Sequence, residues 1–148
     1  QTGLRGITIS PDDDGLKAEP VWKNIEAQPN ITHGVRVGGH YYGIGDPAKL
    51  VCVDIATGKT AWSNDSLSFP DPKRAMAAFI VMGKNILSLS SGGELCLFEA
   101  SPRGFNELGR TQVCGLNWCM PAYVDGWLFV RDGIKKKGGN LICLDLAK

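Results

Sequence analysis

The sequence predicts an all-β protein built from β-propeller blades, each a sheet of four antiparallel strands. Three copies of one pattern carry this prediction, in which a glycine turn separates two apolar runs. The shared glycines, Gly39, Gly83 and Gly126, lie 44 and 43 positions apart. A further apolar run follows each of them and contains Cys52, Cys96 or Cys143. A period of about 40–50 residues made of short strands is typical of propeller blades.

Each copy yields strands in the same order. For the first complete blade, 31–64, we expect strands over 32–37, 41–44, 50–55 and 60–63, with Gly38 and Gly39 as a two-residue hairpin turn. For the second, 75–114, we expect strands over 77–81, 85–90, 94–99 and 109–114. The partial blade 118–148 contributes strands over 120–124, 127–131 and 140–146.

The chain starts inside another partial blade, 1–24. Strands over 4–10 and 19–23 match the third and fourth strands of the repeat, and 11–15 forms the bend between them. A closed ring of four blades is one arrangement, with 19–23 completing the last blade. We favour a segment of a larger propeller of about seven or eight blades. Its open edges are then covered by missing sequence or by another copy of the chain.

Composition and charge exclude several classes of function. The chain is 43% hydrophobic and 21% charged, as in ordinary globular proteins. A net charge of +1 argues against nucleic-acid binding, which needs clustered basic residues. No apolar stretch approaches the roughly 18–20 residues of a membrane-spanning helix. The one basic run, 135–137, lies between glycines and is predicted to be a loop tip.

The five cysteines do not predict a metal site, because no CxxC or CxxH spacing occurs. We expect Cys52, Cys96 and Cys143 to occupy one repeat position and to be buried as small apolar residues between sheets. Equivalent positions of neighbouring blades are too far apart for a disulfide. Only Cys114 and Cys119 are a candidate pair, and the sequence leaves open whether they are bonded.

The most specific motif spans residues 52–62 and contains Asp54, Gly58 and Trp62. Gly58 suits the positive φ of a tight turn, and Asp54 can accept hydrogen bonds from turn amides. Trp62 offers a large apolar ring with one N–H that needs a partner. Trp22 lies 40 residues earlier in a matching position.

This motif resembles the tryptophan-docking motif of pyrroloquinoline-quinone (PQQ)-like repeats, and the period is also similar to that of WD40-like and YVTN-like repeats. Cys52 stands where the family has Ala, and Ala56 replaces a basic residue. The resemblance covers nearly the whole chain, but only one blade carries the motif strongly. In the family, the tryptophan wedges against the neighbouring blade. The resemblance therefore implies a propeller in which Trp22 and Trp62 join adjacent blades.

The resemblance implies two kinds of function. Quinone-dependent dehydrogenases hold PQQ and Ca²⁺ on the propeller axis, whereas non-catalytic propellers, such as BamB-like outer-membrane assembly lipoproteins, bind other proteins. The chain lacks the vicinal cysteine pair of the alcohol dehydrogenases, and the acidic run 12–14 lacks the spacing of a calcium loop. We expect a non-catalytic binding or scaffold module without cofactor or metal, periplasmic or extracellular in a bacterium. The alternative is a fragment of a quinoprotein dehydrogenase.

Binding residues are expected in loops, because a rigid scaffold leaves its loops to carry function. From the connections between blades we select His33, Lys73, Arg74, Asn117 and Trp118. From the loops between second and third strands we select Asp46, Arg131 and Asp132. The expected partner is another protein or a second copy of the chain. Trp118 is either a binding anchor or a plug between blades, and the plug is favoured.

Overall fold

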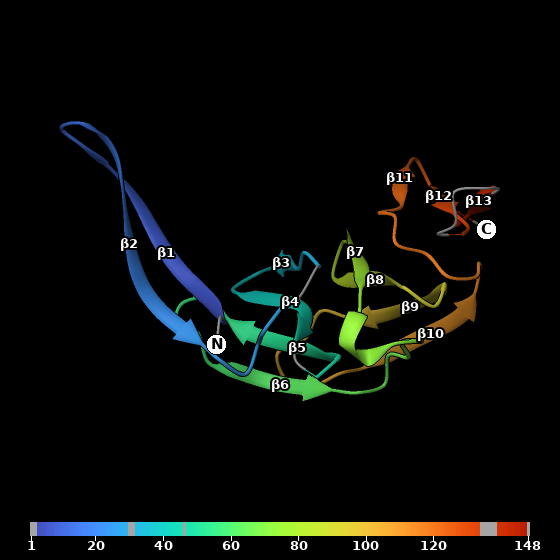
Figure 1. Cartoon of the computed structure of the whole chain (residues 1–148), viewed down its shortest axis with the longest axis horizontal. Helices are drawn as coiled ribbons and strands as arrows, with labels where there is room; N and C mark the ends of the chain where they lie inside the picture. The colour runs from blue at the N-terminus through green and yellow to red at the C-terminus, as the bar shows by residue number, and fades with distance from the viewer. Residues whose placement is uncertain (1–2, 30–31, 46, 134–138, 148) are drawn as a thin grey trace.

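The structure is a computed structural model that describes residues 3–29, 32–45, 47–133 and 139–147. These residues form four antiparallel sheets arranged along an arc (Figure 1). The first sheet is a hairpin of β1 (Leu4–Asp12) and β2 (Gly15–Asn24). The second contains β3 (Val35–Val37), β4 (His40–Gly45), β5 (Lys49–Asp54) and β6 (Thr60–Asn64).

The third sheet contains β7 (Ala77–Met82), β8 (Asn85–Ser90), β9 (Glu94–Glu99) and β10 (Glu107–Gln112). The last contains β11 (Ala122–Val124), β12 (Trp127–Arg131) and β13 (Leu141–Asp145). A short 3₁₀ turn, η1 (Pro72–Arg74), precedes β7. The predicted fold class, with two complete blades and two partial ones, is confirmed. Among the residues described, no helix has the length and apolar character needed to span a membrane.

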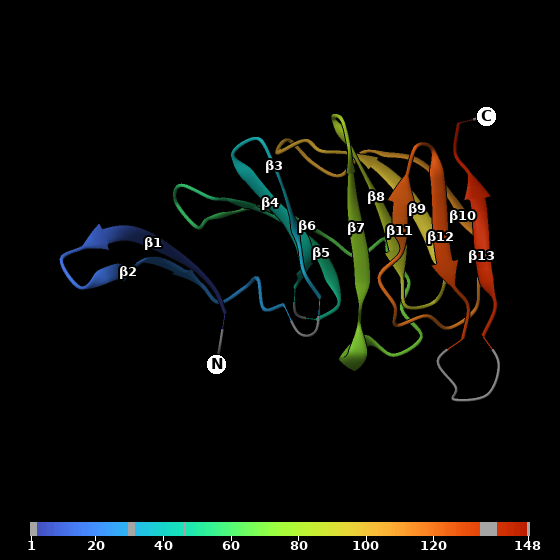
Figure 2. The same ribbon diagram turned by 90° about the horizontal axis from the view of Figure 1, so that it is seen from above.

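The arc does not close on itself. The β1–β2 hairpin lies at one end and the β11–β13 sheet at the other (Figures 1 and 2). The hairpin is a separate two-stranded sheet and does not complete the last blade, so the four-blade ring is wrong for this structure. The hairpin is also longer than expected, because Asp12 pairs with Gly15 and only two residues remain for the turn.

Strand pairing corrects the alignment of the turns. The hairpins close at the pairs Val37–His40, Met82–Asn85 and Val124–Trp127. The first turn residues are therefore Gly38, Gly83 and Asp125, all with positive φ. The alignment of the repeats from sequence, which matched Gly39 with Gly83, therefore displaced the second copy by one residue relative to the first. Positive φ is the conformational constraint, and it falls on the first turn position in every copy.

The same one-residue displacement changes which face each cysteine occupies. Cys52 and Cys143 lie two residues before Asp54 and Asp145, which end their ladders, whereas Cys96 lies three residues before Glu99. Because side chains alternate along a strand, Cys96 points to the opposite side of its sheet. Cys52 of the second sheet and Cys96 of the third sheet consequently point toward each other's sheets and belong to one core cluster between them.

Cys143 is exposed, so the prediction that it is buried is wrong. No described sheet covers its face. All five cysteines are free thiols, which leaves Cys114 and Cys119 unpaired. Burial raises the pKa of Cys52 and of Cys96 to about 11.

The core consists of layers between successive sheets. In β7, Ala77 and Phe79 pack toward the β3–β6 sheet, while Ala78 and Ile80 pack toward the β11–β13 sheet. The third sheet is thus apolar on both faces, as expected for a sheet between two others. A smaller layer around Ala27 joins the hairpin to the second sheet.

Two tryptophans connect adjacent sheets. The indole nitrogen of Trp22 donates a hydrogen bond to the Ile55 carbonyl at 2.8 Å, and that of Trp62 donates to the Ser101 carbonyl at 2.8 Å. Gly58 has φ +72°, and a Cβ there would lie within 2.5 Å of the Trp22 ring. The Asp54 carboxylate shapes the same turn by accepting the backbone N–H and hydroxyl of Thr57, each at 2.8 Å.

In the third sheet Gly109 occupies the position of these tryptophans, because it pairs with Leu97, two residues before Glu99, as Trp62 pairs with Cys52, two residues before Asp54. The next residue, Arg110, opposes Cys96 and therefore lies on the other face, toward the second sheet. Its guanidinium forms ion pairs with Glu107 at 2.6 Å and Glu94 at 2.9 Å. It also donates to the Ser66 carbonyl at 3.0 Å, so it bonds back to the preceding connection.

Replacing Trp62 with Ala should destabilise the chain by about 3 kcal/mol, since it removes ring packing against Tyr42 and Phe105 together with the bond to Ser101. Trp62→Phe keeps an aromatic ring and should cost about 1 kcal/mol, the usual value of one hydrogen bond, plus any loss from the smaller ring. Denaturant unfolding curves measure both losses of stability: the midpoint shifts, while the slope of unfolding free energy against denaturant concentration stays equal to that of the unmodified chain. An unchanged midpoint for the alanine variant would contradict the role of Trp62.

A thiol reagent should distinguish the three repeat cysteines. In the native chain Cys143 should react rapidly, whereas Cys52 and Cys96 should react only after unfolding, because they are 0% exposed and their pKa values are raised by burial. Mass spectrometry of peptides after timed labelling identifies each site. Equal rates at Cys52 and Cys143 would show that the second sheet is not covered.

Candidate functional site

The loops that were expected to bind a partner lie along one side of the arc. Figure 2 shows the connections between successive sheets, together with the β4–β5 and β8–β9 loops, along its lower side. The tight turns after β3, β7 and β11 lie along the opposite, upper side in the same view. We call the lower side the loop end. Two connections matter most there, 65–76 and 113–121.

These two connections enclose a small cavity of about 140 Å³. It is lined by Pro70, Asp71, Arg74, Ser91, Leu116 and Trp118. The structure thereby brings together Arg74 and Trp118, which the sequence placed in separate connections. Trp118 is 46% exposed. The interpretation of Trp118 as a plug between blades is wrong, because an inter-sheet plug would be covered on both sides of its ring.

Arg74 is presented by the short η1 turn. Asp71 caps this turn by accepting the backbone N–H of Lys73 at 3.0 Å, and Pro72 starts it with a suitable φ. The guanidinium of Arg74 lies 3.9 Å from the Asp71 carboxylate, and both side chains are more than half exposed. A surface pair of this length contributes little to stability, so the guanidinium can change partners at low cost.

The 113–121 connection is held by polar groups beneath it. Asn117 is buried, its N–H donates to the Ser91 carbonyl at 3.0 Å, and its side-chain oxygen accepts the N–H of Cys119 at 2.8 Å. The Asp132 carboxylate accepts the N–H of Gly115 at 2.8 Å. Asn117 and Asp132 therefore use their polar atoms to fix the connection, and Trp118 is the group that it displays.

The other selected residues are dispersed around the loop end. His33 and Lys73 are exposed, and Lys73 lines a separate cavity of about 50 Å³ near Gln28. Arg131 is exposed, with a guanidinium nitrogen 3.5 Å from the Cys119 sulfur. Asp46 lies outside the described residues.

Two apolar residues at this site were not selected from the sequence. Leu116 is 46% exposed and Met120 is 58% exposed, on either side of Trp118. Their alternation at positions 116, 118 and 120 was the available signal. The repeat pattern predicted a strand over 120–124 here, which hid Met120 as a loop residue. The structure starts β11 only at Ala122.

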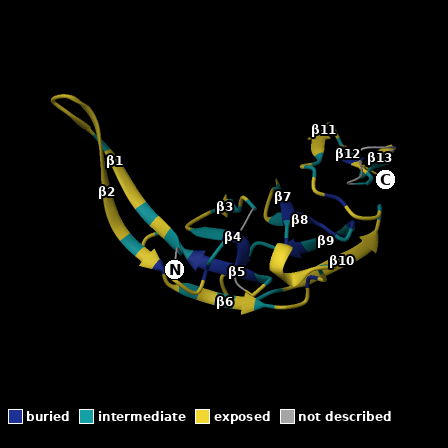
Figure 3. Cartoon of the chain, in the orientation of Figure 1, coloured by how far each residue is buried: buried dark blue, intermediate teal, exposed yellow. Residues whose placement is uncertain are grey.

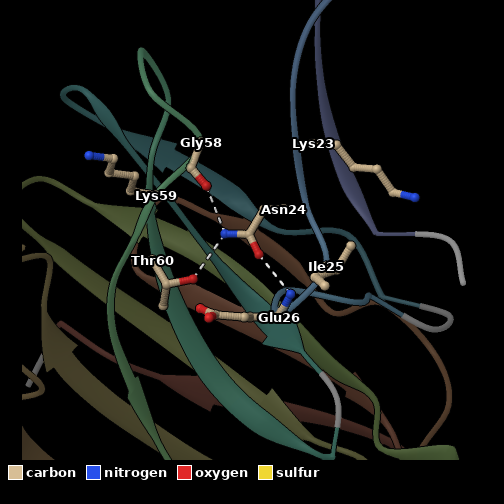
Figure 4. A pocket seen from close by; sticks show the side chains of 7 residues that line it. All are labelled: Lys23, Asn24, Ile25, Glu26, Gly58, Lys59 and Thr60. Atoms are coloured by element: carbon tan, nitrogen blue, oxygen red, sulfur yellow. Dashed lines mark hydrogen bonds between the residues drawn. The ribbon is translucent and has the colours of Figure 1, made fainter.

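A separate cleft of about 410 Å³ lies at the end of β2 (Figure 4). Asn24 lies at its centre, and its amide donates to the Gly58 carbonyl at 2.7 Å and the Thr60 hydroxyl at 2.9 Å. Figure 4 shows Lys23 and Lys59 pointing in opposite directions, so the two ammonium groups do not converge on one ligand position. We interpret this cleft as a joint between the first two sheets.

The described part of the chain brings together no group of three or more His, Cys, Asp or Glu residues that could hold a metal ion. His40, at the start of β4, lies 3.8 Å from the carboxylate of Asp54, at the end of β5. Hydrogen bonds from Thr57 hold the pKa of Asp54 below its usual value. Asp54 is thus an anionic group that organises a turn.

Comparison with known proteins identifies the architecture. No protein-family model matches the chain, and no curated protein matches it. Among solved structures, the chain is similar to BamB from Moraxella catarrhalis, with a TM-score of 0.63 and 15% sequence identity over 97% of this chain and 47% of BamB. The computationally designed Ika8 protein matches with a TM-score of 0.34 and 11% identity over 84% of this chain and 52% of that protein, which is too low to carry an argument.

The chain spans about half the length of BamB. At 15% identity, this likeness concerns the fold and not the activity. The chain is an all-β propeller segment with the architecture seen in BamB.

Proposed function

We propose that this chain is a non-catalytic propeller segment that binds a protein partner through its loop end, with Trp118 as the anchor. The observation that carries the proposal is the half-exposed Trp118 ring beside the 140 Å³ cavity. Tryptophan and arginine are enriched among the residues that dominate protein–protein affinity. Arg74 lines the same cavity, so both residue types meet at one place.

The connection that carries Trp118 is suited to binding because it is ordered before a partner arrives. Buried Asn117 and the Asp132 carboxylate hold its backbone from below. A preordered loop loses less conformational entropy on association, so more of the contact energy contributes to affinity. Leu116 lines the cavity together with Trp118, and the exposed Met120 follows two residues later in the same connection.

The basic groups at this site favour a partner with acidic side chains beside an apolar one. Arg74 is exposed beside the cavity and Arg131 is exposed beside Cys119 of the same connection, whereas the carboxylates of Asp71 and Asp132 already accept backbone N–H groups. Complementary charge raises the rate of association and restricts the choice of partner. An apolar side chain of the partner would occupy the cavity while its carboxylates face the arginines.

The family resemblance adds two further elements to this proposal. Trp22 and Trp62 act as the docking tryptophans of PQQ-like repeats, and their indole hydrogen bonds to the following sheet support that role. The likeness to BamB, together with the repeat pattern, supports a periplasmic or extracellular location. No observation in the described residues favours the quinoprotein dehydrogenase alternative.

Peptides selected from a random library for binding to this chain should bind the Trp118→Ala variant about 30-fold more weakly, as expected for an aromatic hot spot worth about 2 kcal/mol. Arg74→Glu should weaken acidic peptides further. Fluorescence anisotropy of labelled peptides gives the dissociation constants.

Trp127→Ala is the matched control, because Trp127 is 44% exposed and starts β12 directly after the tight turn that follows β11, away from both connections of the site. Its affinity for the same peptides should stay within about twofold of the unmodified chain. Peptides that lose affinity for the Trp127 variant and keep it for the Trp118 variant would place binding elsewhere and refute the proposal.

A further inference from the structure

The cavity between the two connections is built around a backbone bridge. Ser91 follows β8, in the β8–β9 loop, and is 3% exposed. Its N–H donates to the Met76 carbonyl at 2.7 Å, and its carbonyl accepts the N–H of Asn117 at 3.0 Å. Met76 and Asn117 belong to the two connections that enclose the cavity. Ser91 therefore fixes the spacing between the two walls of the cavity, which it also lines.

A glycine brings the same loop against the 113–121 connection. Gly93 has φ +85°, and a Cβ there would collide with the Cys114 carbonyl. The Gly93 carbonyl accepts the N–H groups of Val113 at 3.0 Å and Cys114 at 3.3 Å. The strands that carry the loop, β8 and β9, are buried over most of their length (Figure 3). Because the loop and both connections are fixed in this way, the cavity exists before any ligand enters it.

The volume of the cavity limits what it can hold. Its volume is about 140 Å³. An engineered apolar cavity of about 150 Å³ takes up one benzene molecule. The walls contributed by Pro70, Leu116 and Trp118 are apolar. The cavity therefore fits one side chain of the size of leucine or phenylalanine, whereas a tryptophan side chain is larger than the space.

Arg74 provides an unused carboxylate site on the wall of the cavity. One oxygen of Asp71 accepts the N–H of Lys73 at 3.0 Å, and the other lies 3.9 Å from Nε of Arg74, beyond hydrogen-bond distance. In the part of the chain that the structure describes, no carboxylate oxygen lies closer to this guanidinium. A guanidinium has five N–H donors, and its planar fork matches the two oxygens of one carboxylate. Arg74 can therefore bind a ligand carboxylate without giving up a hydrogen bond to Asp71.

A carboxylate on Arg74 must be attached close to the side chain that fills the cavity, because both contact the same wall. Along an extended peptide, successive side chains point to opposite sides, so an acidic neighbour of the inserted residue points away. The next acidic side chain on the same side is about 7 Å further along. The last residue of a chain differs, because its side chain and its α-carboxylate share one Cα atom. Within a polypeptide, only this residue offers both groups together at the mouth of one cavity.

We propose that the cavity binds the free C-terminus of a partner protein. The last side chain, of the size of leucine or phenylalanine, lies between Leu116 and Trp118, and its α-carboxylate binds the guanidinium of Arg74. The inference rests on the proposed function, because it uses the same site, and it specifies which part of the partner that site takes.

A library of hexapeptides with random sequences and free C-termini tests the inference on the full chain. The selected peptides should end in leucine or phenylalanine. When they are made again with a C-terminal amide, they should bind about tenfold more weakly, because the amide cannot form the charge-assisted pair with Arg74. Fluorescence anisotropy of peptides labelled at the N-terminus gives both dissociation constants.

Two arginine variants assign this difference to its site. Arg74→Gln should weaken the free acids about tenfold and bring the affinities of acid and amide close to each other. Arg103→Gln is the matched control, because Arg103 is exposed and lies in the β9–β10 connection, outside the cavity. It removes the same charge and should keep the tenfold ratio. Circular dichroism should show an unchanged fold for both variants, since both side chains are exposed.

The outcomes separate this inference from the proposed function. Peptides that lose affinity for Trp118→Ala but bind equally well as acids and as amides would overturn the inference and leave the proposed function standing. Peptides that keep their affinity for Trp118→Ala would refute the proposed function and the inference with it. A library that yields no binder, selected peptides without a preferred last residue, or an acid-to-amide ratio that survives Arg74→Gln would also overturn the inference.

Discussion

Most of the structure depends on the covering of sheet faces by neighbouring sheets. The third sheet is apolar on both sides, so neither side can face water without cost. At roughly 25 cal/mol for each Å² of apolar surface, the layers between sheets supply most of the driving force for folding. The hydrophobic effect has no preferred direction, so an apolar layer by itself tolerates some sliding. The indole N–H groups of Trp22 and Trp62 each reach a single carbonyl just beyond the third strand of the following sheet, at Ile55 and Ser101, which fixes how far one sheet is displaced along the next.

This arrangement supports the proposal that the loop end binds a partner. The apolar layers and the two tryptophans hold the strands rigidly. Many side chains of the connections are not part of the core and are therefore available for binding. The connection around Trp118 has both a fixed backbone and a side chain outside the core. Buried Asn117 fixes its backbone, while the indole ring remains half exposed beside Arg74. Contiguous exposed apolar patches rimmed by polar residues mark interaction sites, whereas single exposed apolar residues are common on protein surfaces.

The sequence by itself determined the repeat, the strand type and most strand positions. Strands β8, β9 and β12 begin and end where the pattern predicted, since alternating apolar residues between turn residues leave little freedom. It also identified Asp54, Gly58 and Trp62, because the turn and the large ring have local chemical requirements. The loop residues Arg74 and Trp118 were selected, but nothing in the sequence showed that they share a cavity.

Tertiary structure decided the features that depend on neighbours distant in sequence. Cys52, Cys96 and Cys143 have similar local sequences, yet two are buried and one is exposed, because only the sheets of the first two have a covering sheet on the cysteine side. A displacement of one residue sent Cys96 to the opposite face, which no composition or period reveals. The exposure of Trp118 was decided in the same way. Burial is a property of what packs against a residue, and the sequence states only what the residue is.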